Sequence, residues 1–71
     1  MDENQTLIRF GQRVRQRRLS NGITLEKLAL EIGIDTKHLG GIERGKRNPT
    51  LLMMSKIAAA LSTTLPALLD D

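Results

Sequence analysis

The sequence predicts an all-α domain of five short helices, and three observations support this fold class. Apolar residues recur at intervals of three and four along most of the chain, which is the period of a helix that buries one face. Residues suited to helix caps separate these segments at short intervals. No stretch alternates polar and apolar residues as a half-buried strand would. At 71 residues, the chain has room for a single domain, residues 1–71, with one small core.

The first helix is expected over about residues 5–20 and the second over about residues 24–32. Their buried stripes would be Leu7, Phe10, Gly11, Val14 and Arg18 in the first helix and Leu25, Leu28, Ala29 and Ile32 in the second. Gly22 suits the left-handed position that ends the first helix, and Gly33 suits the same position after the second. The Thr24 hydroxyl is expected to cap the second helix.

The third helix is expected over about residues 36–44, the fourth over about residues 50–61 and the last over 65–69. Asp35 and Thr50 are suitable N-caps. The apolar side chains expected to face the core are Leu39, Ile42, Leu51, Met54, Ile57, Ala58, Leu61, Leu65, Leu68 and Leu69. The core would be aliphatic, because the sequence has a single aromatic residue.

The composition argues against an enzyme. The sequence has no cysteine and one histidine, His38, which excludes disulfides, thiolate metal sites and multi-histidine sites. No nucleophile, base and orienting group can be assembled from the remaining residues. We therefore expect no catalytic residue, metal, cofactor or small-molecule ligand. The apolar runs are far shorter than the roughly 20 residues that span a membrane, and without a signal peptide the expected location is the cytoplasm.

The charge distribution favours a polyanionic partner. The net charge is +3, and residues 4–69 hold all eleven Lys and Arg but only four acidic residues, a formal charge of +7. Nucleic acid is the first partner to consider, and an anionic membrane surface is the second. A basic surface that only keeps the protein soluble stays open at this point. A membrane partner is less favoured, since the apolar helix faces are needed for the core.

Residues 24–45 carry the most informative pattern. They comprise a helix, a three-residue turn containing Gly33, and a second helix, which is typical of a helix-turn-helix. In such a unit the second helix enters the major groove, roughly 12 Å wide, while the first braces it against the backbone.

The stretch Gly33-Ile-Asp-Thr-Lys-His-Leu-Gly-Gly-Ile-Glu-Arg-Gly-Lys-Arg-Asn-Pro49 resembles the Xre-type, Cro/repressor-like helix-turn-helix family. The resemblance covers about residues 10–69 and implies the five-helix, lambda-repressor-like DNA-binding fold. Residues 39–45 also resemble the small controller proteins of restriction–modification systems.

The resemblance implies that the outer face of the third helix contacts bases. The positions concerned are Thr36, Lys37, His38 and Gly41. The candidate phosphate contacts around this helix are Arg15, Arg44, Lys46, Arg47 and Asn48, with a merely solvated basic face as the alternative. Gly41 has no side chain to contact a base, and Leu25 stands where the family usually has a glutamine that contacts phosphate. Specificity would then depend more on Lys37, His38 and DNA shape.

The third helix contains two consecutive glycines, Gly40 and Gly41, each of which costs about 1 kcal/mol relative to alanine. They indicate either a close approach of the backbone to DNA or to a neighbouring helix, or a weak helix that tightens only on binding. Arg18 is unusual in a different way, because it continues an apolar stripe where a charge needs a partner. The resemblance implies that this partner is Glu43, in a structural ion pair.

Four apolar residues suggest a self-association surface. Leu52 and Met53 lie off the buried stripe of the fourth helix, and Ala67 and Leu69 lie near the same end of the domain. One helix contacts only four or five base pairs, so two copies related by a two-fold axis would double the contacts. We therefore expect an isologous homodimer. The alternative is that these residues cover an imperfect core.

These observations together predict a sequence-specific regulator of transcription that binds double-stranded DNA as a homodimer on a palindromic operator. A controller of a restriction–modification operon and a repressor of a phage or mobile element both fit, acting by blocking or contacting RNA polymerase. The alternative is an antitoxin that binds a toxin and regulates its own operon. Antitoxins of this fold commonly carry an extra segment that wraps the toxin. Only about four residues precede the first helix here and two follow Leu69, which counts against that alternative.

Overall fold

The computed structural model describes residues 2–69, which form five helices and no strand. In chain order they are α1 (Glu3–Ser20), α2 (Leu25–Ile32), α3 (Thr36–Glu43), α4 (Leu51–Ala60) and α5 (Leu65–Leu69). The predicted all-α, five-helix fold is confirmed. The main difference from the expected bounds is at the start of α1, which begins at Glu3 because the Asp2 side chain accepts a hydrogen bond from the Gln5 N–H at 2.8 Å.

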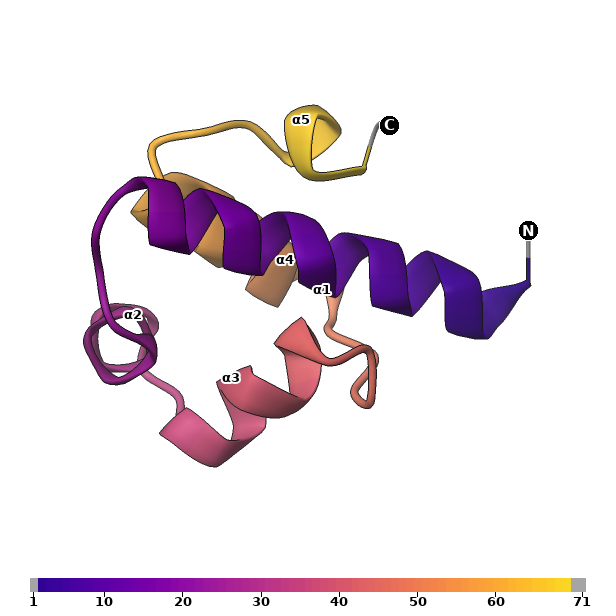
Figure 1. Ribbon diagram of the computed structural model, residues 1–71, viewed down its shortest axis with the longest axis horizontal. Helices are drawn as coiled ribbons and strands as arrows, with labels where there is room; N and C mark the ends of the chain where they lie inside the picture. Colours follow the sequence, from indigo (N-terminus) through magenta and orange to yellow (C-terminus); the bar gives the residue numbers. More distant parts are fainter. Residues whose placement is uncertain (1, 70–71) are drawn as a thin grey trace.

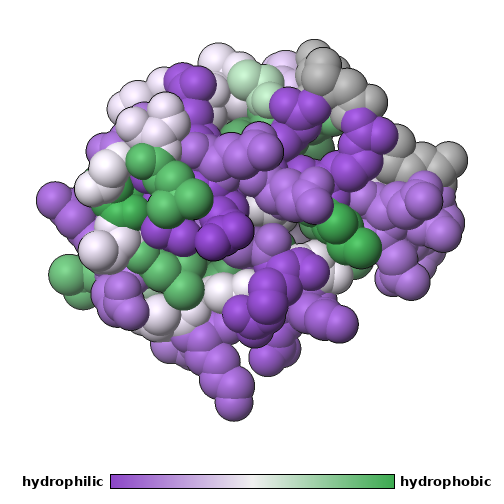
Figure 2. Space-filling model, in the orientation of Figure 1, coloured by the Kyte–Doolittle hydropathy of each residue, from purple (hydrophilic) through white to green (hydrophobic). Residues whose placement is uncertain are grey.

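Helix α1 crosses the whole molecule, and the other helices pack around it (Figure 1). It contacts α3 on one side and α5 on the other, while α4 contacts α2 and α5. In the orientation of Figure 1, α3 forms the lower edge of the molecule, and this edge is mainly hydrophilic (Figure 2). The arrangement leaves one long side of α3 uncovered by any other helix.

Side-chain caps explain why the short helices begin where they do. The Thr24 hydroxyl accepts from the Lys27 N–H at 3.1 Å, the Asp35 carboxylate from the His38 N–H at 2.7 Å, and the Thr50 hydroxyl from the Met53 N–H at 3.1 Å. Each bond satisfies an N–H group that has no partner within its own helix. All three N-caps were expected from the sequence.

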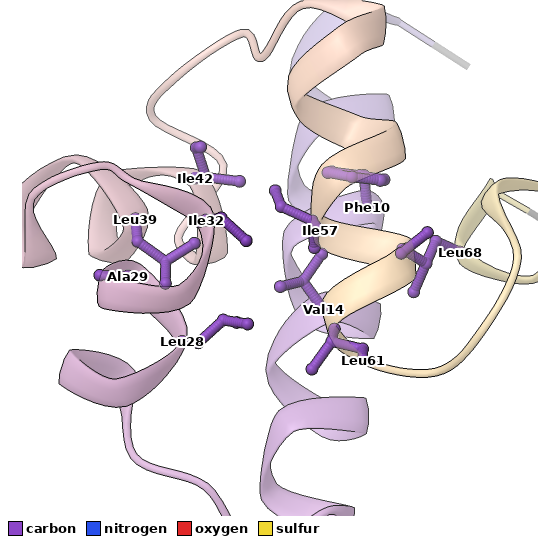
Figure 3. Packing of buried hydrophobic residues seen from close by; sticks show 11 residues of the cluster. Phe10, Val14, Leu28, Ala29, Ile32, Leu39, Ile42, Ile57, Leu61 and Leu68 are labelled. Carbon is purple, nitrogen blue, oxygen red and sulfur yellow. The ribbon is translucent and has the colours of Figure 1, made fainter.

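The core lies between α1, α4 and the helix pair α2–α3 (Figure 3). Its buried residues are Phe10, Val14, Leu28, Ala29, Ile32, Leu39, Ile42, Ile57, Ala58, Leu61 and Leu68. Three residues expected to face the core are not part of it, since Leu7 is only half-buried, Leu51 is 67% exposed and Leu69 is 53% exposed. Full burial in α4 begins only at Ile57, so the first turn of that helix projects beyond the core. Helix α5 has five residues, and only Leu68 among them is buried.

Candidate DNA-binding interface

The turn between α2 and α3 sets the direction in which α3 leaves α2. Gly33 adopts a left-handed conformation with φ of 80°, and the Ile34 N–H donates to the Ala29 carbonyl at 3.0 Å. Ile34 packs against the core as a partly buried residue. The turn is therefore fixed at both ends before Asp35 caps α3.

A close contact between backbones holds the C-terminal end of α3 against α1. A Cβ atom on Gly11 would lie 2.8 Å from the Glu43 carbonyl carbon, and closer still to the carbonyl oxygens of Ile42 and Glu43. Gly45 meets the same side of α1 one turn nearer its N-terminus, since a Cβ there would lie 2.7 Å from the Ile8 Cα. Gly45 also has φ of 74°, a conformation that side chains disfavour. Glycine at both positions lets α3 sit directly on α1.

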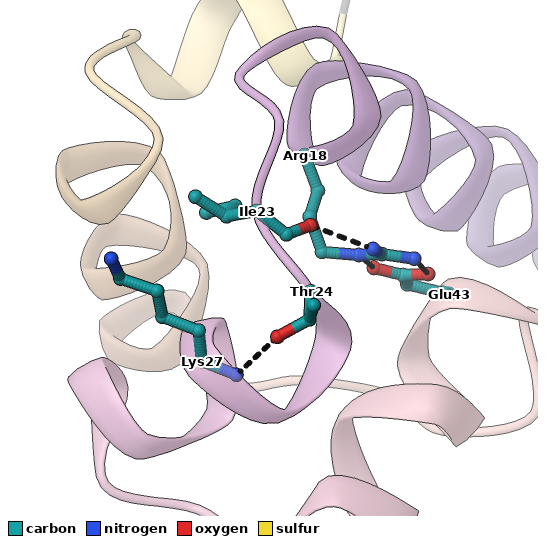
Figure 4. Close-up of polar contacts among 5 residues, drawn as sticks. All are labelled: Arg18, Ile23, Thr24, Lys27 and Glu43. Carbon is teal, nitrogen blue, oxygen red and sulfur yellow. Dashed lines mark hydrogen bonds and ion pairs between the residues drawn. The ribbon is translucent and has the colours of Figure 1, made fainter.

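A buried ion pair reinforces this contact (Figure 4). Arg18 Nε lies 2.7 Å from Glu43 Oε2, and Arg18 Nη2 donates to Glu43 Oε1 at 3.0 Å. The third guanidinium nitrogen, Nη1, donates to the Ile23 carbonyl at 3.0 Å. The two side chains are only 10% and 5% exposed. Arg18 thus joins α1, the turn that follows it and α3.

The ion pair keeps Arg18 charged in spite of its burial. Its hydrogen bonds to Glu43 raise the pKa of the Arg18 guanidinium above its ordinary value, and desolvation opposes this only in part. Among residues 2–69, no buried side-chain nitrogen or oxygen lacks a hydrogen-bond partner. The charges are therefore compensated, as burial of a charged pair requires.

The N-terminal turn of α3 presents three of the four expected base-contacting residues at the surface. Lys37 is exposed, and Thr36 and His38 are partly buried. The fourth, Gly41, was expected to face solvent, and that expectation was wrong. Gly41 is buried because the Arg47 side chain lies over it, so that a Cβ on Gly41 would be 2.8 Å from Arg47 Cγ.

Gly40 is buried in a similar way. A Cβ atom there would lie 3.0 Å from Arg44 Nη1 and 3.5 Å from Leu25 Cδ2. The two glycines do not interrupt α3, which is continuous from Thr36 to Glu43. In this structure the closest approach that they permit is to the side chains of Arg44 and Arg47, and Gly40 also contacts the Leu25 side chain of the neighbouring helix α2.

The candidate phosphate-contacting residues are all exposed: Arg15, Arg44, Lys46, Arg47 and Asn48. Arg15 of α1 and Arg44 at the end of α3 line one shallow depression where α1, α2 and α3 meet. Gln12 and Leu25 line the same depression. Gln12 was not predicted from the sequence, although its position three residues before Arg15 places it on the same side of α1. Asn48 lies apart from this group, beside Glu3 and Thr6 at the start of α1.

Three of the four residues expected to form a self-association surface are exposed. Leu52 is 68% exposed, and Ala67 and Leu69 are exposed as well. Met53, by contrast, is partly buried and packs against the core, so its expected position off the buried stripe was wrong. Leu51 takes its place as an exposed apolar residue of α4.

The part of the chain that the structure describes contains no group of three or more His, Cys, Asp or Glu residues that could hold a metal ion. Nor does any helix within residues 2–69 have the length and apolar character needed to cross a membrane.

The helix-turn-helix family model matches residues 14–68. The chain belongs to the helix-turn-helix family. This helix-turn-helix protein is 36% identical to control protein C.MunI of Mycoplasma sp. The match covers 96% of this chain and 93% of the relative. Control protein C.BamHI of Bacillus amyloliquefaciens is 43% identical, over 94% and 84% of the two chains.

Solved structures agree with these sequence relatives. The restriction–modification controller protein C.AhdI from Aeromonas hydrophila superposes with a TM-score of 0.84 at 42% identity, covering 87% of this chain and 94% of the other. The biofilm regulator SinR, solved in complex with DNA, superposes with a TM-score of 0.80 at 35% identity, covering 86% and 98%. The chain is thus a DNA-binding helix-turn-helix transcriptional regulator of the Xre type, similar to restriction–modification control proteins. The relatives are regulators, not enzymes.

Proposed function

We propose that this protein binds a palindromic operator as a homodimer, with specificity for its sequence, and controls a restriction–modification operon. The observation that carries this proposal is the placement of α3. Its N-terminal turn exposes Lys37 on a helix whose other end is fixed to α1 by the Arg18–Glu43 pair. A helix fixed in this way can enter a groove without losing much further conformational freedom.

Thr36, Lys37 and His38 are proposed to contact base edges. The Lys37 ammonium can donate to guanine O6 and N7, and the Thr36 methyl can contact a thymine methyl. His38 donates or accepts according to its tautomer. Gly41 is no longer proposed to contact a base, because Arg47 covers it.

Basic residues around α3 are proposed to bind the phosphates on either side of the groove. Arg15 and Arg44 share one depression beside α3, while Lys46 and Arg47 follow its C-terminal end. Phosphate contacts of this kind set affinity and register, not sequence preference. Asn48 is proposed to contribute a neutral donor.

Self-association is proposed through α4 and α5, which pack against each other. Their exposed apolar residues are Leu51, Leu52, Ala67 and Leu69. Apolar residues gathered on so small a domain favour a partner, and a two-fold axis would place two α3 helices about 34 Å apart, one turn of DNA. The operator would then be palindromic, and its occupancy would block or contact RNA polymerase.

The proposal is tested by selecting bound duplexes from a random pool and then titrating salt. We expect a palindromic motif and a slope of log affinity against log salt of about −7. This value follows from four basic residues in each of two protomers at about 0.9 per phosphate contact. A single half-site should bind more weakly, and analytical ultracentrifugation should show a dimer on the full site. Equal affinity for every duplex would contradict the proposal.

A further inference from the structure

We infer that Gly41 is a positioning residue for DNA binding. Because it has no side chain, it leaves space in which the Arg47 side chain lies across the outer face of α3 before DNA binds. The inference rests on the proposed DNA-binding function and adds to it a residue that itself contacts no DNA. Gly41 is buried although helical spacing places it on the side of α3 opposite the buried Leu39 and Glu43, and the three atoms nearest to a Cβ at this position all belong to Arg47.

The backbone after α3 explains how Arg47 reaches this position. The Gly45 N–H donates to the Ile42 carbonyl at 3.1 Å, and the Lys46 N–H donates to the Gly41 carbonyl at 2.8 Å. These two bonds close the C-terminal end of the helix in a Schellman motif. Because Lys46 is bonded to Gly41, the next residue, Arg47, begins its side chain beside the α-carbon of Gly41.

The missing side chain at position 41 decides where Arg47 can lie. A Cβ atom there would be 2.8 Å from Arg47 Cγ, 3.3 Å from Nε and 3.6 Å from Cδ. Three consecutive atoms of the Arg47 side chain, Cγ, Cδ and Nε, therefore lie within 3.6 Å of the place that a methyl group on residue 41 would occupy, and this group would displace the side chain. Arg47 is otherwise exposed, so a displaced side chain would turn into solvent without disturbing the core.

Holding the stem on α3 has a consequence for binding. Ordering a long side chain when DNA binds costs free energy, and this cost lowers the affinity for DNA. A side chain that is already ordered in the free protein avoids the cost. Gly40 provides a contrast, since a Cβ there would be crowded only by the tip of Arg44, with Nη1 at 3.0 Å, and would make an ordinary van der Waals contact of 3.5 Å with Leu25 Cδ2. That tip can move while the stem of Arg44 keeps its place.

The test is a double-mutant cycle in DNA affinity, using the full chain and the operator selected from the random pool. Gly41→Ala is expected to weaken binding about two- to tenfold per protomer, the effect of freeing one long side chain in each. In the Arg47→Ala background, Gly41→Ala should have no further effect. Gly40→Ala is the matched control, and its effect on affinity, whatever its size, should be the same with and without the Arg47 side chain.

Two further measurements separate positioning from a structural role. Gly41→Ala should not lower the midpoint of thermal unfolding, because alanine favours the helix. The salt slope should also stay unchanged, since Arg47 keeps its charge, whereas Arg47→Ala should reduce the slope by about 1 per protomer. Relaxation of ¹⁵Nε should show Arg47 becoming more mobile in Gly41→Ala, with Arg15 as the internal reference.

The inference is overturned if Gly41→Ala weakens binding equally with and without the Arg47 side chain, because the methyl group would then obstruct DNA directly. Unchanged affinity or unchanged Arg47 mobility in Gly41→Ala would also overturn it. The proposed function fails by a different result, namely a wild-type protein that prefers no duplex over another.

Discussion

Replacing Glu43 by glutamine should destabilise the protein strongly, because it leaves the Arg18 guanidinium buried without a counter-charge. The substitution keeps the size and shape of the side chain. It replaces one carboxylate oxygen with an NH₂ group, which would face the N–H groups of Arg18 in place of an acceptor. The hydrogen bond from Arg18 Nη1 to the Ile23 carbonyl, at 3.0 Å, is left in place.

Glutamine keeps one acceptor oxygen, so one of the two bonds that Glu43 makes, at 2.7 and 3.0 Å, is lost. A hydrogen bond to a charged group contributes about 1.5–3 kcal/mol, and breaking a buried pair by removing one partner costs about 3–5 kcal/mol. The two estimates meet at about 3 kcal/mol. A domain of this size has only about 4–10 kcal/mol of total stability, so this loss removes roughly a third to three quarters of it.

Urea unfolding followed by circular dichroism at 222 nm measures this loss, and thermal unfolding gives a second value. A loss of 3 kcal/mol corresponds to a midpoint lower by about 12–24 °C in a domain of 60–100 residues. The difference from wild type should persist in 1 M salt, because buried pairs are screened little. Glu31→Gln removes a charge from an exposed position of α2 and should change the unfolding free energy by less than about 0.5 kcal/mol.

A double variant completes this test. Arg18→Met combined with Glu43→Leu removes both charges and should recover most of the loss, since apolar replacements of a buried pair are often neutral or stabilising. A Glu43→Gln protein that loses less than about 1 kcal/mol would show that water reaches the pair, and the account of how α3 is anchored would be wrong.

Further predictions concern packing, backbone strain and DNA contacts. Gly11→Ala should lower the unfolding free energy by about 2–3 kcal/mol, because its methyl group overlaps the carbonyls at the end of α3; a raised thermal midpoint would refute this. Ser62 has φ of 57°, so Ser62→Gly should add about 1 kcal/mol in urea unfolding, whereas Ser62→Ala, which keeps the strain, should add nothing. In competition binding, Lys37→Ala should weaken the operator about 1–3 kcal/mol more than random duplex, while Arg15→Ala should weaken both alike and reduce the salt slope. The reverse pattern would mean that α3 faces DNA differently.

The sequence was sufficient to predict the helices because their signals are local. Thr24, Asp35 and Thr50 cap helices through bonds to residues only three positions away, so each cap depends on a short stretch of chain. The apolar period likewise identified the faces that Leu28, Leu39 and Ile57 bury.

The errors arose where tertiary packing decides. The helical period placed Leu51 and Leu69 on inward faces. A period predicts the direction in which a side chain points, but it does not predict how much of the helix the neighbouring elements cover. Gly41 was expected to face solvent, but it is buried because the loop after α3 returns the side chain of Arg47 over it. Gln12 was missed because it carries no charge and belongs to no motif. Its spacing places it on the same side of α1 as Arg15, but only the meeting of three helices turns that side into a depression.

The most direct test of the central claim is to measure intermolecular nuclear Overhauser effects between the ¹³C,¹⁵N-labelled protein and its selected operator. The account predicts contacts from the side chains of Thr36, Lys37 and His38 to base protons and thymine methyls of the major groove. Contacts from these side chains to minor-groove protons, or base contacts confined to other helices, would contradict it.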